Sequence, residues 1–414
     1  MLDIIILGVI VTALVRTNDG ISNAYGLPKK YSQHLHYLLI YHLCFSVFFT
    51  WYILQFGGDS QGYWRFTMQQ VLIRGDVFWW RYFGTSTTFV LWMTYIPSQI
   101  IGLSYLTGNL IFGALGFIGI RYVFIMTAVN FPQNHAIMNI RLFPLVFYFP
   151  NLHFWTAGVG KDSIAFWGIA WFLFALQSYN TKWWQGLVAL FFVYMTRPHM
   201  GQALIASASV AILFSTEIRR EYKYILGVVT FGVSIYLSDS TLEFLKLEEF
   251  SIVEMETLAN KTAGLLASGK SGIDVSSNSF PLRIFTYMFR PLFIDAHNTM
   301  AFLSSCENAV YLYLSFYIYR NWSPEALRDM PVFLKAGMVV FIPTLLAFAN
   351  SLGNLGAIMR MKNMTMIYFL LFCFWLISYQ KERRLRKTLL RCKTLKSMHI
   401  KLSPLPKGNE VHQY

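Results

Sequence analysis

The chain has 414 residues, of which 55% are hydrophobic, 18% aromatic and only 13% charged. This composition excludes an ordinary soluble globular protein and is typical of a polytopic membrane protein. The net charge of +14 does not indicate nucleic-acid binding, because ten of the 34 lysines and arginines lie between Lys381 and Lys407, after the last apolar run. A basic cluster beside a membrane helix holds that end of the chain in the cytoplasm and attracts anionic lipid.

The apolar runs predict an all-α, polytopic membrane protein with about eleven transmembrane helices, because several runs approach or reach the roughly 20 residues that a helix needs to cross a bilayer. Residues 1–380 are expected to form a transmembrane domain with external loops at 57–106 and 239–297, and residues 381–414 a basic cytoplasmic tail. In chain order, the expected spans cover residues 3–16, 37–56, 107–128, 143–157, 164–178, 184–196, 200–215, 224–238, 298–319, 332–350 and 364–380.

The basic residues predict how these spans are oriented. If the spans alternate in direction, one side of the membrane receives most of the lysines and arginines between them, and the positive-inside rule makes that side the cytoplasm. The N-terminus and the loop around Asp59 then face outward, and the C-terminus faces the cytoplasm. The residues on the predicted cytoplasmic side are Lys29, Lys30, Lys182, Arg219, Arg220, Lys223, Arg320 and those of the tail.

Two external stretches interrupt the hydrophobic pattern. Residues 66–106 interleave basic and aromatic side chains, which suits surface-lying helices in the headgroup layer. Their apolar part, Thr88–Leu106, is not counted as a crossing, because one more span would invert everything downstream. In the second stretch, Thr241–Ala267 has a helix-like pattern, and the segment Ser268–Ser279, rich in Ser and Gly, is expected to be mobile. This loop is either a lid over a membrane site or a solvated connector.

Asp59 belongs to the stretch Gly57–Arg65, which directly follows an apolar run. Its carboxylate is therefore expected at the outer mouth of a membrane helix. There it can act as a general base that takes the proton from an attacking hydroxyl. We predict Asp59 as the catalytic residue; the alternative is a turn or N-cap aspartate after two glycines.

Polar residues at the breaks between apolar runs predict an anion site on the same outer side. Lys161 opposes the helix dipole at the start of its run unless an anion is nearby, so this position is either a phosphate site or a plain helix start capped by Asp162 or Ser163. Arg197 lies on the side where the positive-inside rule disfavours it, which indicates a functional role. Several such cations suit a pyrophosphate, which arginine can grip with two hydrogen bonds. The substrate-binding residues predicted on this basis are Arg65, Lys161, Asp162, Arg197, His199 and Arg360.

Four short strings resemble those of membrane glycosyltransferases. The loop Gly58–Ser60 with Tyr63 resembles the first external loop of the GT-C type, in which the catalytic Asp or Glu lies. The other three resemble strings of bacterial EpsG-like and Wzy-like oligosaccharide repeat-unit polymerases. They are Phe154–Ser163, Phe289–Asn298 with Glu307, and Gly353–Gly356 through Arg360.

The resemblance implies a GT-C-like fold and a polymerase or glycosyltransferase of polyprenyl-pyrophosphate-linked sugars at the outer face of the bacterial cytoplasmic (inner) membrane. It assigns the catalytic role to Asp59 and substrate binding to Lys161, Arg197, Arg290 and Arg360. Asp295 is the acidic residue of the string that contains Arg290, and we include it among the substrate-binding residues.

Two other functional classes stay open: a transporter or flippase of lipid-linked polysaccharide intermediates, and a non-catalytic component of an export complex. The expected partners are a polyprenyl-pyrophosphate-linked oligosaccharide, the lipid bilayer and polysaccharide export machinery, with no nucleic acid. No cofactor is expected. The four cysteines and the histidines show no metal-ligand spacing, and nothing in the sequence supports a divalent metal.

Overall fold

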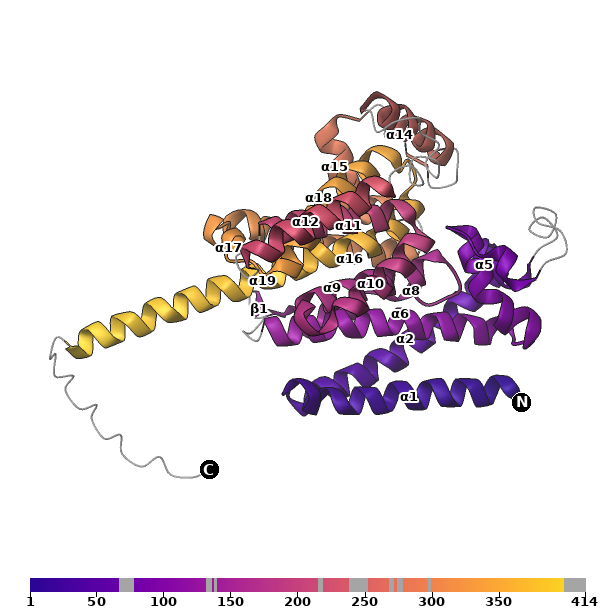
Figure 1. The fold of residues 1–414 in the computed structure, drawn as a ribbon, viewed down its shortest axis with the longest axis horizontal. Helices are drawn as coiled ribbons and strands as arrows, with labels where there is room; N and C mark the ends of the chain where they lie inside the picture. The colour runs from indigo at the N-terminus through magenta and orange to yellow at the C-terminus, as the bar shows by residue number, and fades with distance from the viewer. Residues whose placement is uncertain are drawn as a thin grey trace.

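The computed structural model describes residues 1–66, 78–131, 136–137, 140–214, 219–237, 252–267, 272–273, 278–296 and 299–397. Within these ranges the chain is almost entirely helical (Figure 1). The β structure in these ranges consists of one antiparallel pair of two-residue strands, β1 (Ala136–Ile137) and β2 (Ile140–Arg141), and an isolated bridge between Gly272 and Asn354. This agrees with the all-α class expected from the sequence.

Five helices in the described part of the chain are long and apolar enough to cross a membrane, and they make the chain a membrane protein. Figure 1 shows most of the long helices running along one common direction. The five are α1 (Leu2–Tyr25), α2 (Lys29–Phe56), α6 (Tyr105–Asn130), α18 (Val332–Ser351) and the part Leu355–Leu389 of α19 (Leu355–Ser397).

Five other expected spans fold as helices that are shorter or less apolar than these. They lie close to the positions that the sequence predicts, with ends shifted by a few residues. They are α9 (Lys161–Gln177), α10 (Tyr179–Thr196), α11 (Pro198–Leu213), α12 (Arg220–Tyr236) and α16 (Thr299–Arg320).

The expected helix over 143–157 is not continuous. This stretch forms three short pieces instead: α7 (Leu142–Leu145), the 3₁₀ turn η3 (Val146–Tyr148) and α8 (Pro150–Phe154). Pro144 and Pro150 explain the breaks, because proline cannot donate a backbone hydrogen bond and pushes the residue before it out of the helical region. Phe143 accordingly has extended backbone angles (φ −90°, ψ 126°).

The turns that carry basic residues gather at one end of the bundle. Lys182 in α10 lies 4.1 Å from the centroid of the Phe174 ring and 5.8 Å from that of Tyr25, at the end of α1. Figure 1 places the turn between α1 and α2, the short helix α17 (Pro324–Arg328) and the far part of α19 at the end away from α5 (Thr87–Tyr95). Asp59 begins the helix α3 (Asp59–Arg65), which packs against α5, and Lys161 contacts Ser86 just before α5, so both lie at the opposite end.

The two expected external loops consist of short elements. The first contains α3 (Asp59–Arg65), η1 (Trp79–Tyr82), α5 and the π-helical turn η2 (Ile96–Ile100). Thr88–Leu106 does not form one α-helix, since α5 passes into the π-helical turn η2 at Ile96 and Gly102 (φ 74°) breaks the chain before α6. The second contains α14 (Ile252–Ala267), α15 (Phe280–Phe289) and η4 (Phe293–Asp295). Most of Ser268–Ser279, residues 67–77 and residues 398–414 lie outside the described residues.

The helix α6 guides the chain into the start of α9. A Cβ atom on Gly116 would lie 2.1 Å from the carbonyl oxygen of Thr156, so only glycine permits this approach. Small residues allow such close backbone contacts within membranes. Asn109, also in α6, accepts a hydrogen bond from the backbone N–H of Val159 at 2.8 Å. These contacts fix the path of residues 156–160 towards Lys161.

We expect Gly116→Ala to lower the free energy of unfolding by about 1–3 kcal/mol, the usual cost of overpacking a tight contact. The matched control is Gly20→Ala in α1, where a Cβ atom meets nothing within 4 Å. That change is expected to be neutral or stabilising, since alanine favours helix by up to about 1 kcal/mol. Thermal unfolding of both variants in detergent micelles measures the difference, and equal stabilities would contradict the role assigned to Gly116.

Candidate functional site

Asp59 stands at the first helical position of α3, just after the end of α2. Gly57 (φ 80°) and Gly58 (φ 156°) turn the chain between the two helices with backbone angles that favour glycine. The N-cap of α3 is Gly58, so Asp59 is not the capping residue. Its carboxylate is 68% exposed, and one oxygen lies 3.8 Å from Nη1 of Arg360. The structure thus places an accessible carboxylate beside one of the predicted cations.

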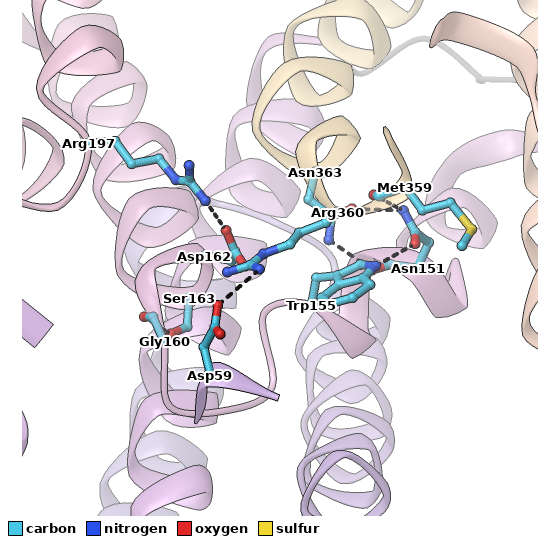
Figure 2. A network of polar contacts seen from close by, with 10 residues as sticks. All are labelled: Asp59, Asn151, Trp155, Gly160, Asp162, Ser163, Arg197, Met359, Arg360 and Asn363. Atoms are coloured by element: carbon cyan, nitrogen blue, oxygen red, sulfur yellow. Dashed lines mark hydrogen bonds and ion pairs between the residues drawn. The ribbon is translucent and has the colours of Figure 1, made fainter. Parts of the chain in front are cut away.

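Asp162, in contrast, is enclosed between two arginines (Figure 2). Arg197 donates from Nη2 to one carboxylate oxygen at 2.5 Å, and Arg360 donates from Nε to the other. The Asp162 side chain is 8% exposed. The N-cap of α9 is Gly160, without a side-chain capping bond, so the capping role considered for Asp162 is wrong. Asp162 instead joins α9 to α19 and to the junction of α10 and α11.

Lys161 precedes the apolar part of α9 and adds a third cation. Its Nζ donates to the hydroxyl of Ser86, just before α5, at 2.9 Å. Burial, together with the nearby Arg197 and Arg360 guanidiniums, lowers the pKa of Lys161 to about 8. Lys161 is therefore mostly protonated at neutral pH but loses its charge in mildly basic solution.

Arg197 is positioned by the break between α10 and α11. Pro198 occupies the first turn of α11, where its fixed φ and missing N–H are tolerated. This leaves Arg197 between the two helices with non-helical angles (φ −144°, ψ 86°). His199 follows in the first turn of α11, is half-buried, and lies close enough to Arg197 and Lys161 for electrostatic interaction. The start of α11 thus places His199 beside the cations Arg197 and Lys161.

Arg360 connects the two carboxylates of the cluster. It binds Asp162 through Nε and approaches Asp59 with Nη1, while its guanidinium carbon lies 5.8 Å from the Trp155 ring centroid. Figure 2 shows the side chain extending from α19 between these groups. The position suits a cation–π contact. Arg360 thus interacts with both the buried carboxylate of Asp162 and the exposed carboxylate of Asp59.

The electrostatics of the cluster give its two carboxylates different roles. Burial would raise the pKa of the Asp162 carboxyl, but Arg360 and Arg197 outweigh it and hold that pKa below its usual value. Asp162 is therefore a permanent anion whose hydrogen-bonding capacity is used by the arginines. Burial and the Asp59 carboxylate raise the pKa of the neighbouring Tyr63 phenol, which stays protonated. Three cations face two carboxylates, so the cluster carries a positive excess suited to an anion.

Three predicted site residues lie outside this cluster. Arg65 is exposed at the end of α3, where its guanidinium lies 2.9 and 3.1 Å from the side-chain oxygen of Gln61 when that amide is turned towards it. Arg290 and Asp295 form their own two-bond pair, at 2.5 and 3.0 Å. This pair connects to α19 through Lys362, which donates to the Arg290 carbonyl at 2.8 Å.

The Arg290–Asp295 pair lies against a different face of α19 from Asp162. Residues two apart on a helix do not share a face, so Lys362 and Arg360 point in different directions. The structure thus brings together Asp59, Lys161, Asp162, Arg197, His199 and Arg360, and leaves Arg65, Arg290 and Asp295 apart from them. Sequence reasoning missed Ser86, one of four consecutive hydroxyl residues (Thr85–Thr88) that match no functional motif. It also gave no role to Trp155, whose only signal is its place in the string Phe154–Ser163.

Within the described residues, no group of three or more His, Cys, Asp or Glu side chains is arranged to hold a metal ion. Searches of protein-family models, curated proteins and solved structures find no match to this chain.

We expect Asp162→Asn to lower the free energy of unfolding by roughly 3–5 kcal/mol, because it leaves two largely buried guanidiniums without their shared anion. Asp59→Asn alters a mostly exposed side chain and is expected to stay within about 0.5 kcal/mol of the native protein. Denaturant unfolding in micelles measures both changes. If Asp162→Asn and Asp59→Asn lower the free energy of unfolding by similar amounts, Asp162 is not the structural anion of the cluster.

Proposed function

We propose that the chain is a membrane glycosyltransferase, of the oligosaccharide repeat-unit polymerase type, that uses polyprenyl-pyrophosphate-linked sugars. The observation that carries this proposal is the accessible carboxylate of Asp59 beside a cluster of three cations at one end of the helical bundle. A carboxylate next to an anion site is what glycosyl transfer from a lipid diphosphate requires.

The chemistry divides between the two parts of the cluster. Asp59 accepts the proton of an acceptor hydroxyl as the hydroxyl oxygen attacks the anomeric carbon of the donor sugar. The bond from that carbon to the diphosphate oxygen breaks, and the diphosphate departs with the electron pair. Lys161, Arg197 and Arg360 are the cations that bind the departing charge, in a largely water-excluded setting where such interactions are strong. Asp162 takes no proton and holds two of these cations in place.

The charge distribution supports an orientation with the site outside the cell. Lys182 and the basic end of α19 lie at the end of the bundle opposite Asp59. By the positive-inside rule that basic end faces the cytoplasm, so Asp59 faces outward. We therefore place the protein in the bacterial cytoplasmic membrane with a cytoplasmic C-terminus. The five helices that are shorter or less apolar than the five described above, together with the broken stretch from α7 to α8, bring the proposed count to about eleven spans of a GT-C-like fold.

Asp59→Asn is expected to reduce the rate of chain extension by about 10²–10⁴, the usual contribution of a general base, without loss of folded protein. The measurement is the length distribution of glycan made by purified protein in liposomes from a polyprenyl-pyrophosphate oligosaccharide. Asp329→Asn is the matched control, because Asp329 binds Arg328 and Tyr379 beyond α16, at the basic end.

Two results would count against this assignment. Undiminished chain extension by Asp59→Asn would remove Asp59 as the base. If the native protein makes no polymer but moves the lipid-linked oligosaccharide across sealed vesicles, the protein is a transporter and the cation cluster binds cargo.

The affinity for farnesyl diphosphate is expected to fall about tenfold between pH 7.5 and pH 9.5, which corresponds to the loss of one charge-assisted contact. Lys161, with a pKa of about 8, is charged at the lower pH and neutral at the higher one. The diphosphate itself is almost fully ionised over this range, since the second pKa of a phosphate ester lies near 6. Calorimetric titration at several pH values measures the change.

Lys161→Arg provides the control, because a guanidinium keeps its charge throughout this pH range. Its affinity for the probe is expected to be independent of pH. A native affinity that is equally independent of pH would exclude Lys161 from the diphosphate site.

A further inference from the structure

Asn151 and Asn363 join α8 to the first turns of α19 through side-chain amides (Figure 2). Asn363 donates from Nδ2 to the carbonyl of Asn151 at 2.8 Å, and Asn151 donates from Nδ2 to Oδ1 of Asn363 at 3.3 Å. The same Nδ2 of Asn151 donates to the carbonyl of Met359 at 2.9 Å. The residues bound in α19 therefore lie immediately before Arg360 and three positions after it.

The Trp155 ring is oriented by the same amide. Its Nε1 donates to Oδ1 of Asn151 at 3.1 Å, while the ring lies beside the Arg360 guanidinium. An asparagine side chain offers one carbonyl and one NH₂ group, and Asn151 uses both. Rotation of that amide would break contacts to α19 and to Trp155 together. Asn151 thus fixes the tryptophan ring that Arg360 packs against.

We call the paired amides of Asn151 and Asn363 the amide clasp. Helix geometry explains how this clasp sets the direction of the Arg360 side chain. Side chains three positions apart lie on one face of a helix, so Asn363 and Arg360 project from α19 towards the same side. Holding Asn363 against α8 fixes the rotation of α19 about its own axis. That rotation aims the Arg360 side chain between Asp162 and Asp59.

Glu307 anchors the clasp from a third helix. This residue of α16 is only 5% exposed, and its Oε1 accepts the backbone N–H of Asn151 at 2.7 Å. That N–H lies in the first turn of α8, where backbone donors have no partner within the helix. A buried carboxylate is costly unless it is hydrogen-bonded and paired with a cation. Lys362 attracts it electrostatically and is itself bound to Asn308 at 2.7 Å.

We propose that Asn151 and Asn363 are positioning residues that hold Arg360 in its anion-binding orientation, and that Glu307 anchors them by binding the Asn151 backbone. The part of this proposal that concerns diphosphate rests on the proposed function. The part that concerns the orientation of Arg360 does not. A merely structural contact between α8 and α19 would affect stability alone, whereas a positioning unit also controls the reactivity of the Arg360 guanidinium.

The test measures how fast phenylglyoxal modifies Arg360 in the full-length protein in detergent, by mass spectrometry of the Arg360 peptide. Asn151→Ala and Asn363→Ala are expected to raise this rate about three- to tenfold, the factor that the loss of one net hydrogen bond corresponds to. Arg328, whose side chain is 76% exposed, serves as the internal reference in every sample. Farnesyl diphosphate affinity is expected to fall by a similar factor.

Matched variants separate positioning from general damage. Asn130→Ala in α6 removes an amide that donates to the Met126 carbonyl of the same helix, and it should leave the Arg360 rate unchanged. Glu307→Gln keeps a carbonyl acceptor for the Asn151 N–H and should stay closer to the native rate than Glu307→Ala does. Trp155→Phe keeps a ring but loses the bond to Asn151, so it tests the clasp if an asparagine variant fails to fold.

The positioning role is overturned if phenylglyoxal modifies Arg360 at the native rate in folded Asn151→Ala and Asn363→Ala. If these two variants do not fold, a native rate in Trp155→Phe overturns it instead. If Arg360 is modified at the native rate in Glu307→Ala but faster in the asparagine variants, Glu307 has no part in positioning Arg360. Absence of farnesyl diphosphate binding by the native protein contradicts the proposed function, while the modification rates still decide whether Arg360 is held by the clasp.

Discussion

The arrangement of the site depends on one carboxylate, that of Asp162, which is shared by Arg197 and Arg360. A largely buried guanidinium needs a partner of opposite charge, because burial of an unpaired ion is far more costly than burial of a pair. Asp162 supplies that partner for two cations from distant parts of the sequence. Three structural units, α9, α19 and the junction of α10 and α11, therefore meet at one point at the end of the bundle opposite its basic turns.

The tight packing of α6 makes this meeting point possible. Gly116 lets the backbone of Thr156 approach α6 directly, and Asn109 binds the N–H of Val159. Residues 156–160 have no regular hydrogen-bonding ladder of their own, so such side-chain contacts must fix their course. Lys161 and Asp162 directly follow that segment. Gly116 and Asn109 of α6 therefore determine the positions of these two charged residues.

Hydropathy predicted most helices of this chain because apolar length is a strong and local signal. It failed at 143–157, where an equally apolar stretch contains Pro144 and Pro150 and breaks into short pieces. The grouping of Asp59, Lys161, Arg197 and Arg360 followed from alternating topology and the distribution of basic residues. The amide clasp could not be predicted, because asparagines in apolar segments carry no local signal that names a partner some 200 positions away in sequence.

The structure also separates two aspartates that sequence patterns alone treat alike. Asp162 accepts from two guanidiniums, which hold its pKa low, and it is hardly exposed, so it is poorly placed to receive a proton from a substrate. Asp59 is mostly exposed and only 3.8 Å from Arg360, a distance at which attraction persists without a hydrogen bond. Environments that differ in this way assign different roles to neighbouring carboxylates. Arg360 touches both, so any anion that binds its outer edge competes with Asp59 and leaves Asp162 in place. In the proposed mechanism, binding of a diphosphate there would release the Asp59 carboxylate when it is needed as a base.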